Sequence, residues 1–296
     1  MTEVTTIGEV PWTRDDIRAS LDEFETLYER RPIRDNSGGM KAPHMFAVWF
    51  MTRALAPRTI VESGIWKGQS TWLLENSCPG ASIISIDLNL SAREYVSRRV
   101  TYSDRDFSEH NWSGLTPDDT LVFFDDHQNA YTRLQQCWWF GFRHVIFEDN
   151  YPPSQGDCYS LKKAFSGAGF QPELGERTQV GVRPSQKLRT KIAALCGLTR
   201  TPRTPQDSRL RVPPNHHDAH FLRERLQTYY EFPPVFQMDK TRWGDPWDQE
   251  RYPTPAPLLQ LSETDAHRVF RDEGVFYTWI CYARLKNSAN VLGEID

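Results

Sequence analysis

The sequence predicts an α/β protein built on a doubly wound, mostly parallel, seven-stranded sheet. The first observation is that short β-branched runs alternate with helix-like runs through residues 57–182. Strands that alternate with helices form parallel sheets with helices on both faces. The second observation is a strongly apolar run, "VFYTWICYARLK" at 275–286, which returns after a long proline-rich stretch. We expect this run to complete the same sheet.

Residues 1–56 are predicted to form a helical extension before the sheet. Thr13 fits an N-cap, and the acids that follow favour the first turn of a helix over 13–30. Its apolar side chains recur at helical spacing, as in Ile17, Leu21 and Phe24. A second helix is expected over 44–55, where Pro57 ends it. The segment "RDNSGGMKAP" between them, at 34–43, is a candidate lid.

Residues 57–182 are predicted to form the Rossmann-like core. The expected strands are the runs 58–63, 81–88, 100–107, 119–126 and 143–150. The expected helices are the runs 70–77, 91–99, 130–141 and 157–167.

Residues 183–261 are predicted to be an insertion, and 262–296 to return to the core. The insertion is rich in proline, and its first part, to residue 211, is basic. The run "NHHDAHFLRERLQTYY" at 215–230 is predicted to be its one helix. The basic part would suit an anionic substrate such as a nucleotide sugar, but a solvated loop is the plainer interpretation.

Bulk composition excludes several classes of protein. The chain has 296 residues, 39% of them hydrophobic and 25% charged, with a net charge of -4. A dedicated nucleic-acid binder would be basic, and no apolar run approaches the roughly 20 residues of a membrane span. The five cysteines are scattered and odd in number, which does not indicate a disulfide framework. We expect a cytoplasmic protein without nucleic-acid or membrane partners, and a homo-oligomer is left open.

Acidic residues follow the predicted strands at the edge where α/β proteins bind ligands. They are Glu62, Asp87, Asp104, Asp125, Asp126, Glu148 and Asp149. Carboxylates repel polyphosphate but suit a cationic ligand, ribose hydroxyls or a hard divalent metal. The loop after the first strand contains Gly64-x-x-x-Gly68-Gln69-Ser70, which matches neither a P-loop nor a dinucleotide fingerprint. Its glycines allow close backbone approach, and Asp87 stands at the distance of a ribose-binding acid.

This pattern resembles the class I S-adenosylmethionine-dependent methyltransferases. Within them, "FFDDHQNAY" and "FEDNYPPSQGDCYSLKKAF" are similar to the macrocin O-methyltransferase group and to the cephalosporin hydroxylase-like group. The resemblance covers about residues 58–165 and the final strand. It implies a cofactor site made by Glu62, Gly64, Lys67, Gly68, Ser70, Asp87 and Asp104. A solvated loop lysine is the plainer interpretation of Lys67.

The same resemblance implies a divalent metal, with Mg²⁺ expected, held by Asp125, Glu148 and Asp149. His127 would be the catalytic base, assisted by Asp125 at the metal. The family spacing of the first acids is D-x-D-H, whereas this chain has Asp125-Asp126-His127. The sequence therefore leaves open which of the two aspartates faces the metal.

The expected activity is O-methylation of a small hydroxylated molecule, such as a sugar or another natural product. Two alternatives remain open at this stage: an oxidative enzyme of the hydroxylase type, and a non-catalytic module on the same fold. Aromatic residues in the insertion, Trp243, Trp247 and Tyr252, are candidates for a lid over the substrate. His216, His217 and His220 are interpreted as a polar helix face and not as a metal cluster.

Overall fold

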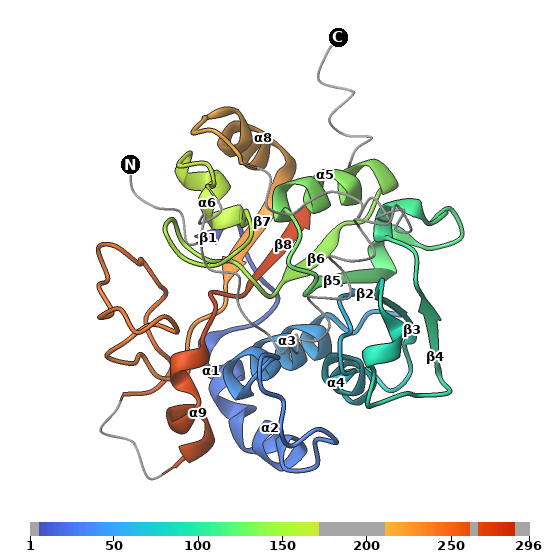
Figure 1. Cartoon of the computed structure of the whole chain (residues 1–296), viewed down its shortest axis with the longest axis horizontal. Helices are drawn as coiled ribbons and strands as arrows, with labels where there is room; N and C mark the ends of the chain where they lie inside the picture. Colours follow the sequence, from blue (N-terminus) through green and yellow to red (C-terminus); the bar gives the residue numbers. More distant parts are fainter. Residues whose placement is uncertain (1–5, 172–210, 261–265, 288–296) are drawn as a thin grey trace, which may run out of the picture.

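The computed structural model describes residues 6–171, 211–260 and 266–287. Its centre is one eight-stranded sheet with helices on both faces (Figure 1). The strands are β1 (Thr6–Ile7), β2 (Thr59–Ser63), β3 (Ser82–Ile86), β4 (Val100–Ser103), β5 (Thr120–Phe124), β6 (His144–Phe147), β7 (Leu226–Glu231) and β8 (Cys281–Leu285). The predicted doubly wound sheet is confirmed, and β1 adds an eighth strand at one edge.

The strand order is β1-β7-β8-β6-β5-β2-β3-β4. Strands β2 to β6 are parallel, whereas β8 runs antiparallel to both of its neighbours, β6 and β7. The chain moves outward from β2 to β3 and β4, and then returns to place β5 on the other side of β2. This reversal makes the carboxyl ends of β2 and β5 the switch point, where open α/β sheets bind ligands.

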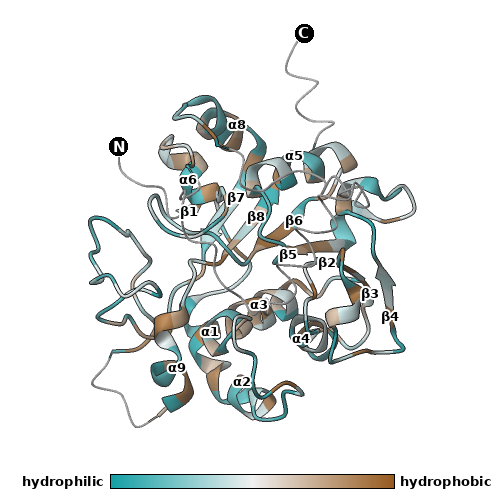
Figure 2. Cartoon of the chain, viewed as in Figure 1, coloured by the Kyte–Doolittle hydropathy of each residue, from teal (hydrophilic) through white to brown (hydrophobic). Residues whose placement is uncertain are grey.

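Two groups of helices cover the two faces of the sheet. On one face lie α1 (Arg14–Ala19), α2 (Leu21–Tyr28), α3 (Ala42–Leu55), α4 (Gln69–Ser77) and α9 (Arg268–Asp272). On the other lie α5 (Ala130–Phe140), α6 (Leu161–Ser166) and α8 (His217–Arg225). Short 3-10 turns are η1 (Leu90–Ala92), η2 (Phe107–Glu109), η3 (Pro117–Asp119) and η5 (Gly274–Phe276). Figure 2 shows the hydrophobic residues concentrated on the central strands, with mostly hydrophilic outer loops.

The central strands are apolar along nearly their whole length because both of their faces are covered. All five residues of β5 are buried. Alternate residues enter different clusters: Phe123 packs toward α3 and α4, whereas Val122 and Phe124 pack toward α5 and α6. Buried parallel strands therefore read as continuous apolar runs, and the period-two alternation of a half-exposed strand is lost.

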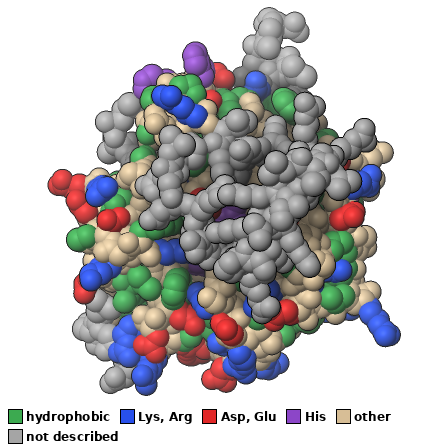
Figure 3. Space-filling model, in the orientation of Figure 1, with side chains coloured by type: hydrophobic (Ala, Val, Ile, Leu, Met, Phe, Trp, Pro, Cys, Tyr) green, Lys and Arg blue, Asp and Glu red, His purple; other side chains and the backbone are tan. Residues whose placement is uncertain are grey.

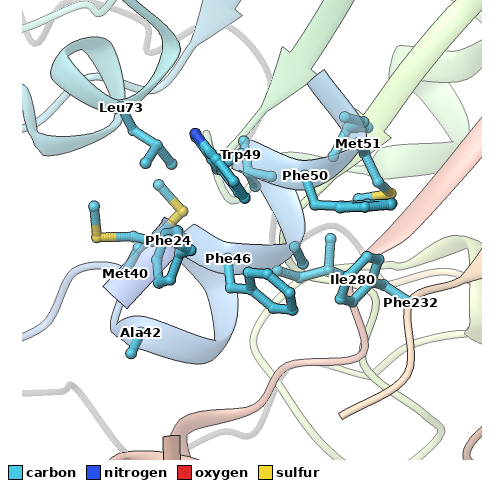
Figure 4. Packing of buried hydrophobic residues seen from close by; sticks show 14 of the residues in the cluster. Phe24, Met40, Ala42, Phe46, Trp49, Phe50, Met51, Leu73, Phe232 and Ile280 are labelled. Atoms are coloured by element: carbon cyan, nitrogen blue, oxygen red, sulfur yellow. The ribbon is translucent and has the colours of Figure 1, made fainter. Parts of the chain in front are cut away.

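Helix α3 lies at the centre of the larger core. Its aromatic residues Phe46, Trp49 and Phe50 contact Phe24 of α2 and Phe232, which follows β7 (Figure 4). The centroids of the Phe46 and Phe24 rings are 5.3 Å apart. The N-terminal helices are therefore integral to the core that supports the sheet.

The single helix expected over 13–30 is divided in two at Ser20. Thr13 caps α1 as predicted, forming a reciprocal capping box with Asp16. Ser20 ends α1 and begins α2, and its hydroxyl donates a hydrogen bond to the Ile17 carbonyl oxygen at 2.7 Å. A serine that bonds to the preceding turn in this way competes with continuous helix hydrogen bonding.

The helix predicted over 91–99 is wrong, because only the η1 turn is helical there. The backbone N–H groups of Glu94 and Tyr95 donate to the carbonyl oxygen of Lys67 at 2.8 and 2.9 Å. The side chains of Tyr95, Ser97 and Arg99 all bond to Glu75 of α4. Long-range partners thus replace the local hydrogen bonds that a helix would have made.

The predicted helix over 215–230 is correct only for its first part. Residues 226–231 form β7, which pairs with β8 and brings the described part of the predicted insertion into the sheet. Thr228, Tyr229 and Tyr230 have high strand propensity, and pairing with β8 outweighs the helical spacing read from the sequence. The ammonium of buried Lys162 in α6 contacts both oxygens of Glu231, at 2.9 and 2.8 Å, which fixes α6 on β7.

Candidate functional site

The loop after β2 lies at the switch point and needs both of its glycines. Gly64 has φ +99°, and a Cβ there would lie 2.1 Å from the carbonyl oxygen of Asp125. Gly68, the residue before α4, has φ +94°, and its Cβ would lie 2.5 Å from the carbonyl oxygen of Tyr95. The glycines let this loop lie directly against the backbones that follow β5 and η1.

Asp87, at the end of β3, reaches the same loop. One of its carboxylate oxygens accepts hydrogen bonds from the backbone N–H groups of Ile65 and Trp66, at 3.0 and 2.8 Å. The other accepts from the N–H of Asn89 at 2.8 Å. A carboxylate offers about four acceptor positions, so Asp87 retains capacity for further donors at this edge.

Glu62 lies beneath the loop and is completely buried. Its Oε2 accepts hydrogen bonds from Thr71 in α4 at 2.7 Å and from Ser85 in β3 at 2.5 Å. Burial raises the pKa of Glu62 to about 7, although hydrogen bonds from Ser70, Ser85 and Thr71 oppose this rise. Glu62 and Ser70 therefore join β2, β3 and α4 under the loop.

The other two residues predicted to bind the cofactor lie at the rim. The ammonium of Lys67 is 2.8 Å from a Glu94 oxygen and 3.3 Å from the carbonyl oxygen of Asp35. It therefore ties the loop to the 34–43 segment, which supports the interpretation of Lys67 as a loop residue. Asp104 is exposed directly after β4.

Two of the predicted metal ligands and the predicted base meet at the ends of β5 and β6. Ligand atoms of Asp125, His127 and Asp149 all lie within 4.8 Å of one another. A small cavity opens beside them. It is lined by Phe124, Asp125, Asp126, His127, Gln128, Ala130, Arg133, Phe147, Asp149 and Cys158.

The neighbouring Asp126 points away from this group. Its Oδ2 accepts hydrogen bonds from the Ser63 hydroxyl at 2.8 Å and from Arg133 Nε at 2.9 Å. Arg133 is buried and also binds Asp106 at 2.6 Å. Burial opposes ionisation of Asp106, but the Arg133 guanidinium outweighs it and holds the pKa of Asp106 below its usual range. The geometry thus favours Asp125 over Asp126 as a ligand.

Asp149 is a buried carboxylate at the centre of this group. Neither of its oxygens has a hydrogen-bond partner of good geometry within the described residues. Its compensation is ionic, since His127 Nδ1 lies 2.8 Å from Oδ2. Burial opposes the charge, but the imidazolium prevails and lowers the pKa of Asp149. A buried carboxylate in this state is a strong ligand for a cation.

The pKa values of His127 and Asp125 are both raised, whereas that of Asp149 is lowered. The carboxylate of Asp149 raises the pKa of His127 well above its usual value, against the effect of burial. Burial, together with the charge of Asp149, raises the pKa of Asp125 well above that of a free aspartate. His127 has φ +51° and a side chain that is 52% exposed, so its ring stands at the mouth of the site beside Asp157.

The third predicted metal ligand, Glu148, faces a different partner. Its Oε1 lies 2.7 Å from Nδ1 of buried His44. The Thr278 hydroxyl donates to the same Glu148 oxygen at 3.3 Å. Burial lowers the pKa of His44 to about 3, and burial together with Asp149 raises the pKa of Glu148. A protonated Glu148 beside a neutral imidazole accounts for this contact. The structure does not bring Glu148 into the group formed by Asp125, His127 and Asp149.

Several residues of the site were missed in the sequence analysis. They are His44, Asp106, Arg133, Tyr151, Asp157 and Arg242. Most of them come from elements whose position relative to the strand ends depends on the tertiary fold. Asp157 was accessible to sequence reasoning, because it lies in the "QGDCYS" run that carried the family resemblance.

The other candidates divide between core and surface. Trp247 stacks on Trp279 at 5.0 Å, and Tyr252 is buried in the same cluster, so both are packing residues. Trp243 is exposed. Histidine side chains lie at the surface over α8 (Figure 3), where His220 pairs with Glu224 at 3.2 Å. The basic run 183–210 lies outside the described residues.

Within the described ranges 6–171, 211–260 and 266–287, no helix is both long and apolar enough to cross a membrane.

Comparison with known proteins gave structural neighbours only. Neither a family model nor a curated protein matches the chain. A structure described as cmcI-N160 with SAH aligns at 21% identity over 40% of this chain and 66% of that chain, with a TM-score of 0.34. The SAH-bound Podospora anserina methyltransferase PaMTH1 aligns at 16% identity over 62% of this chain and 79% of that chain, with a TM-score of 0.36.

A third neighbour is the O-methyltransferase TomG from Streptomyces achromogenes in complex with SAM. It aligns at 18% identity over 64% of this chain and 86% of that chain, with a TM-score of 0.32. In the first of these alignments, the chain spans 66% of the length of cmcI-N160, just under two thirds. Similarity at this level does not establish a shared activity.

The raised pKa of Glu62 predicts a pH-dependent cost to folding. The unfolded carboxyl titrates near pH 4.5 and the folded one near 7. The contribution of Glu62 to the free energy of unfolding is therefore fully present below pH 4.5. It is lost as the pH rises through 7, which lowers the free energy of unfolding by about 3 kcal/mol. Glutamine does not titrate, so in urea unfolding we expect the free energy of unfolding of Glu62→Gln, relative to that of the wild type, to rise by about this much between pH 4.5 and 8. Glu109→Gln, at an exposed site, is the control, and a pH-independent difference for Glu62→Gln would contradict the assignment.

Proposed function

We propose that the protein is an S-adenosylmethionine-dependent O-methyltransferase that uses a divalent cation and acts on a small hydroxylated molecule. One observation carries the proposal: the glycine loop with Asp87 and the group Asp125, His127 and Asp149 meet at one switch point. The two sites share a backbone contact, because Gly64 lies against the carbonyl of Asp125. Ligands bound at the two sites would therefore be neighbours.

The first site suits a nucleoside that carries a positive charge. Asp87 accepts three backbone N–H groups and keeps about one acceptor position for a ribose hydroxyl, and the loop presents backbone at close range. The adjoining strand ends carry acids, which favour a sulfonium and disfavour a polyphosphate. S-adenosylmethionine combines a ribose, a sulfonium and a methyl group ready for transfer.

The second site fits a divalent cation. Asp149 presents buried oxygens without a hydrogen bond of good geometry among the described residues, and Asp125 supplies a second carboxylate beside it. Carboxylate oxygens suit Mg²⁺. Such a cation, when bound, lowers the pKa of a substrate hydroxyl that it contacts. Glu148 remains a proposed ligand that would first have to turn from His44.

His127 is the proposed base. Its ring stands at the mouth of the site, where an acceptor hydroxyl would arrive. While Asp149 holds only His127, the imidazole stays protonated, since this carboxylate raises its pKa. A cation held by Asp149 would weaken that effect, and the His127 ring would then be able to accept a proton. Asp157, 3.3 Å from Nδ1, would then stabilise the imidazolium that forms.

An oxidative enzyme is the second candidate. The imidazole nitrogen beside two carboxylates is the observation that favours it, because iron accepts such mixed donors more readily than magnesium does. An activity that requires Fe(II) and an oxidant, with no methyl transfer, would support this alternative.

Cofactor binding gives the first test. We expect isothermal titration with S-adenosylhomocysteine to show one site per chain. Asp87→Asn should weaken binding about tenfold or more, because it replaces the charged acceptor of a ribose hydroxyl by a neutral one. Asp118→Asn is the matched control, since Asp118 lies in the η3 turn that precedes β5, at the opposite edge. No binding by the wild type would refute the proposal.

Metal binding gives the second test. In Mn²⁺ titrations followed by electron paramagnetic resonance, we expect one site that Mg²⁺ competes for. Asp125→Asn and Asp149→Asn should each weaken it at least tenfold, because each removes an anionic ligand. Asp126→Asn should change it less than threefold, because the asparagine oxygen can still accept the hydrogen bonds from Ser63 and Arg133 that fix this loop. Equal losses for Asp125→Asn and Asp126→Asn would contradict the assignment.

A further inference from the structure

Residues 239–247 form a small hairpin beside the candidate site. Lys240 and Pro246 are paired in an antiparallel bridge. The N–H of Thr241 donates to the Asp245 carbonyl oxygen at 2.8 Å, and that of Gly244 donates to the Thr241 carbonyl oxygen at 2.9 Å. The segment belongs to the loops that follow β7, drawn in orange in Figure 1. Arg242 and Trp243 occupy its tip.

The hairpin is fixed to the loop that follows β6. The amide of buried Gln155 lies 3.2 Å from both the Thr241 hydroxyl and an Asp245 oxygen. At the base of the hairpin, Trp247 stacks on Trp279. Because the middle of the hairpin and its C-terminal end are attached to packed elements, the fold determines the position of its tip.

Arg242 reaches the acid group through Tyr151. Its Nη1 donates to the Tyr151 hydroxyl at 3.1 Å. The Tyr151 ring is buried against Gly156. Only glycine leaves room for the ring there, because a Cβ at position 156 would lie 1.9 Å from it. The hydroxyl lies next to Asp149 and helps to lower the pKa of that residue. One side chain therefore separates the guanidinium from the proposed cation site.

The tip presents a cation and an aromatic face to a ligand. A guanidinium has five N–H donors, and Arg242 uses one of them in the hydrogen bonds seen within the described residues. Trp243 is 47% exposed and packs edge-on against Tyr151, with ring centroids 4.9 Å apart. Trp243 is exposed and Arg242 is partly exposed, so neither side chain is closed off from a ligand.

We propose that Arg242 and Trp243 recognise the methyl acceptor, and that the acceptor is a hydroxylated ring bearing a carboxylate. This inference rests on the proposed function. Arg242 would pair with the carboxylate through its planar fork, and Trp243 would cover the ring. A carboxylate fits better than a phosphate because Asp149 and Asp157 lie close by, and they would repel a dianion more strongly. The ring is that of a sugar acid or of an aromatic hydroxy acid.

Two matched pairs of probes test the inference. The pairs are glucuronate with glucose, and 3,4-dihydroxybenzoate with catechol. We measure their binding by ligand-observed NMR to the full chain with S-adenosylhomocysteine and Mg²⁺. In at least one pair the acid should bind about tenfold more tightly than its neutral partner, as expected for a charge-assisted contact. The pair that shows this preference distinguishes the sugar acid from the aromatic acid.

The variants separate charge from stacking. Arg242→Gln should abolish the preference for the acid, and Arg242→Lys should keep part of it, because lysine retains the charge without the planar fork. Trp243→Ala should weaken both members of a pair by a similar factor. Lys240→Gln, which removes a cation from the same hairpin, is the control and should change neither affinity.

Two results would overturn the inference: equal binding of acid and neutral partner in both pairs, or a preference that survives Arg242→Gln. Binding of S-adenosylhomocysteine is measured in the same samples. If the cofactor binds and no preference for acids appears, the hairpin inference fails alone. If the cofactor does not bind, the proposed function fails.

Discussion

The carboxylate of Asp126 is the interaction on which the geometry of the site depends. It accepts hydrogen bonds from Ser63 at the end of β2 and from Arg133 in α5. Arg133 in turn holds Asp106, which follows β4. Three strand ends are thereby fixed to one buried guanidinium. Because adjacent residues of an extended chain point to opposite sides, the pairing of Asp126 directs Asp125 toward the site.

The same constraint explains the glycine at position 64. With Asp126 bonded to Ser63, the backbone of Asp125 lies against the residue that follows β2. Gly64 accommodates this contact because it has no Cβ. The glycine loop and the acid group therefore share one structural support, and a substitution that loosens either one should disturb the other.

Sequence reasoning predicted the features that follow from local patterns. The alternation of strands and helices gave the sheet, and the acids placed after each strand came to one edge because parallel strands end together. It failed where long-range contacts decide. Tyr95 and Ser97 bond to Glu75 in place of a helix, and Tyr229 pairs with β8. The partner of Glu148, His44, lies in a helix about 100 residues earlier in the chain, a pairing that no spacing rule indicates.

A crystal structure with S-adenosylhomocysteine and Mn²⁺ would test the central claim most directly. We expect a ribose hydroxyl bonded to Asp87, and an anomalous peak for manganese between Asp125 and Asp149. Cofactor bound away from the loop that contains Gly64 and Gly68, or manganese bound away from these two aspartates, would contradict it.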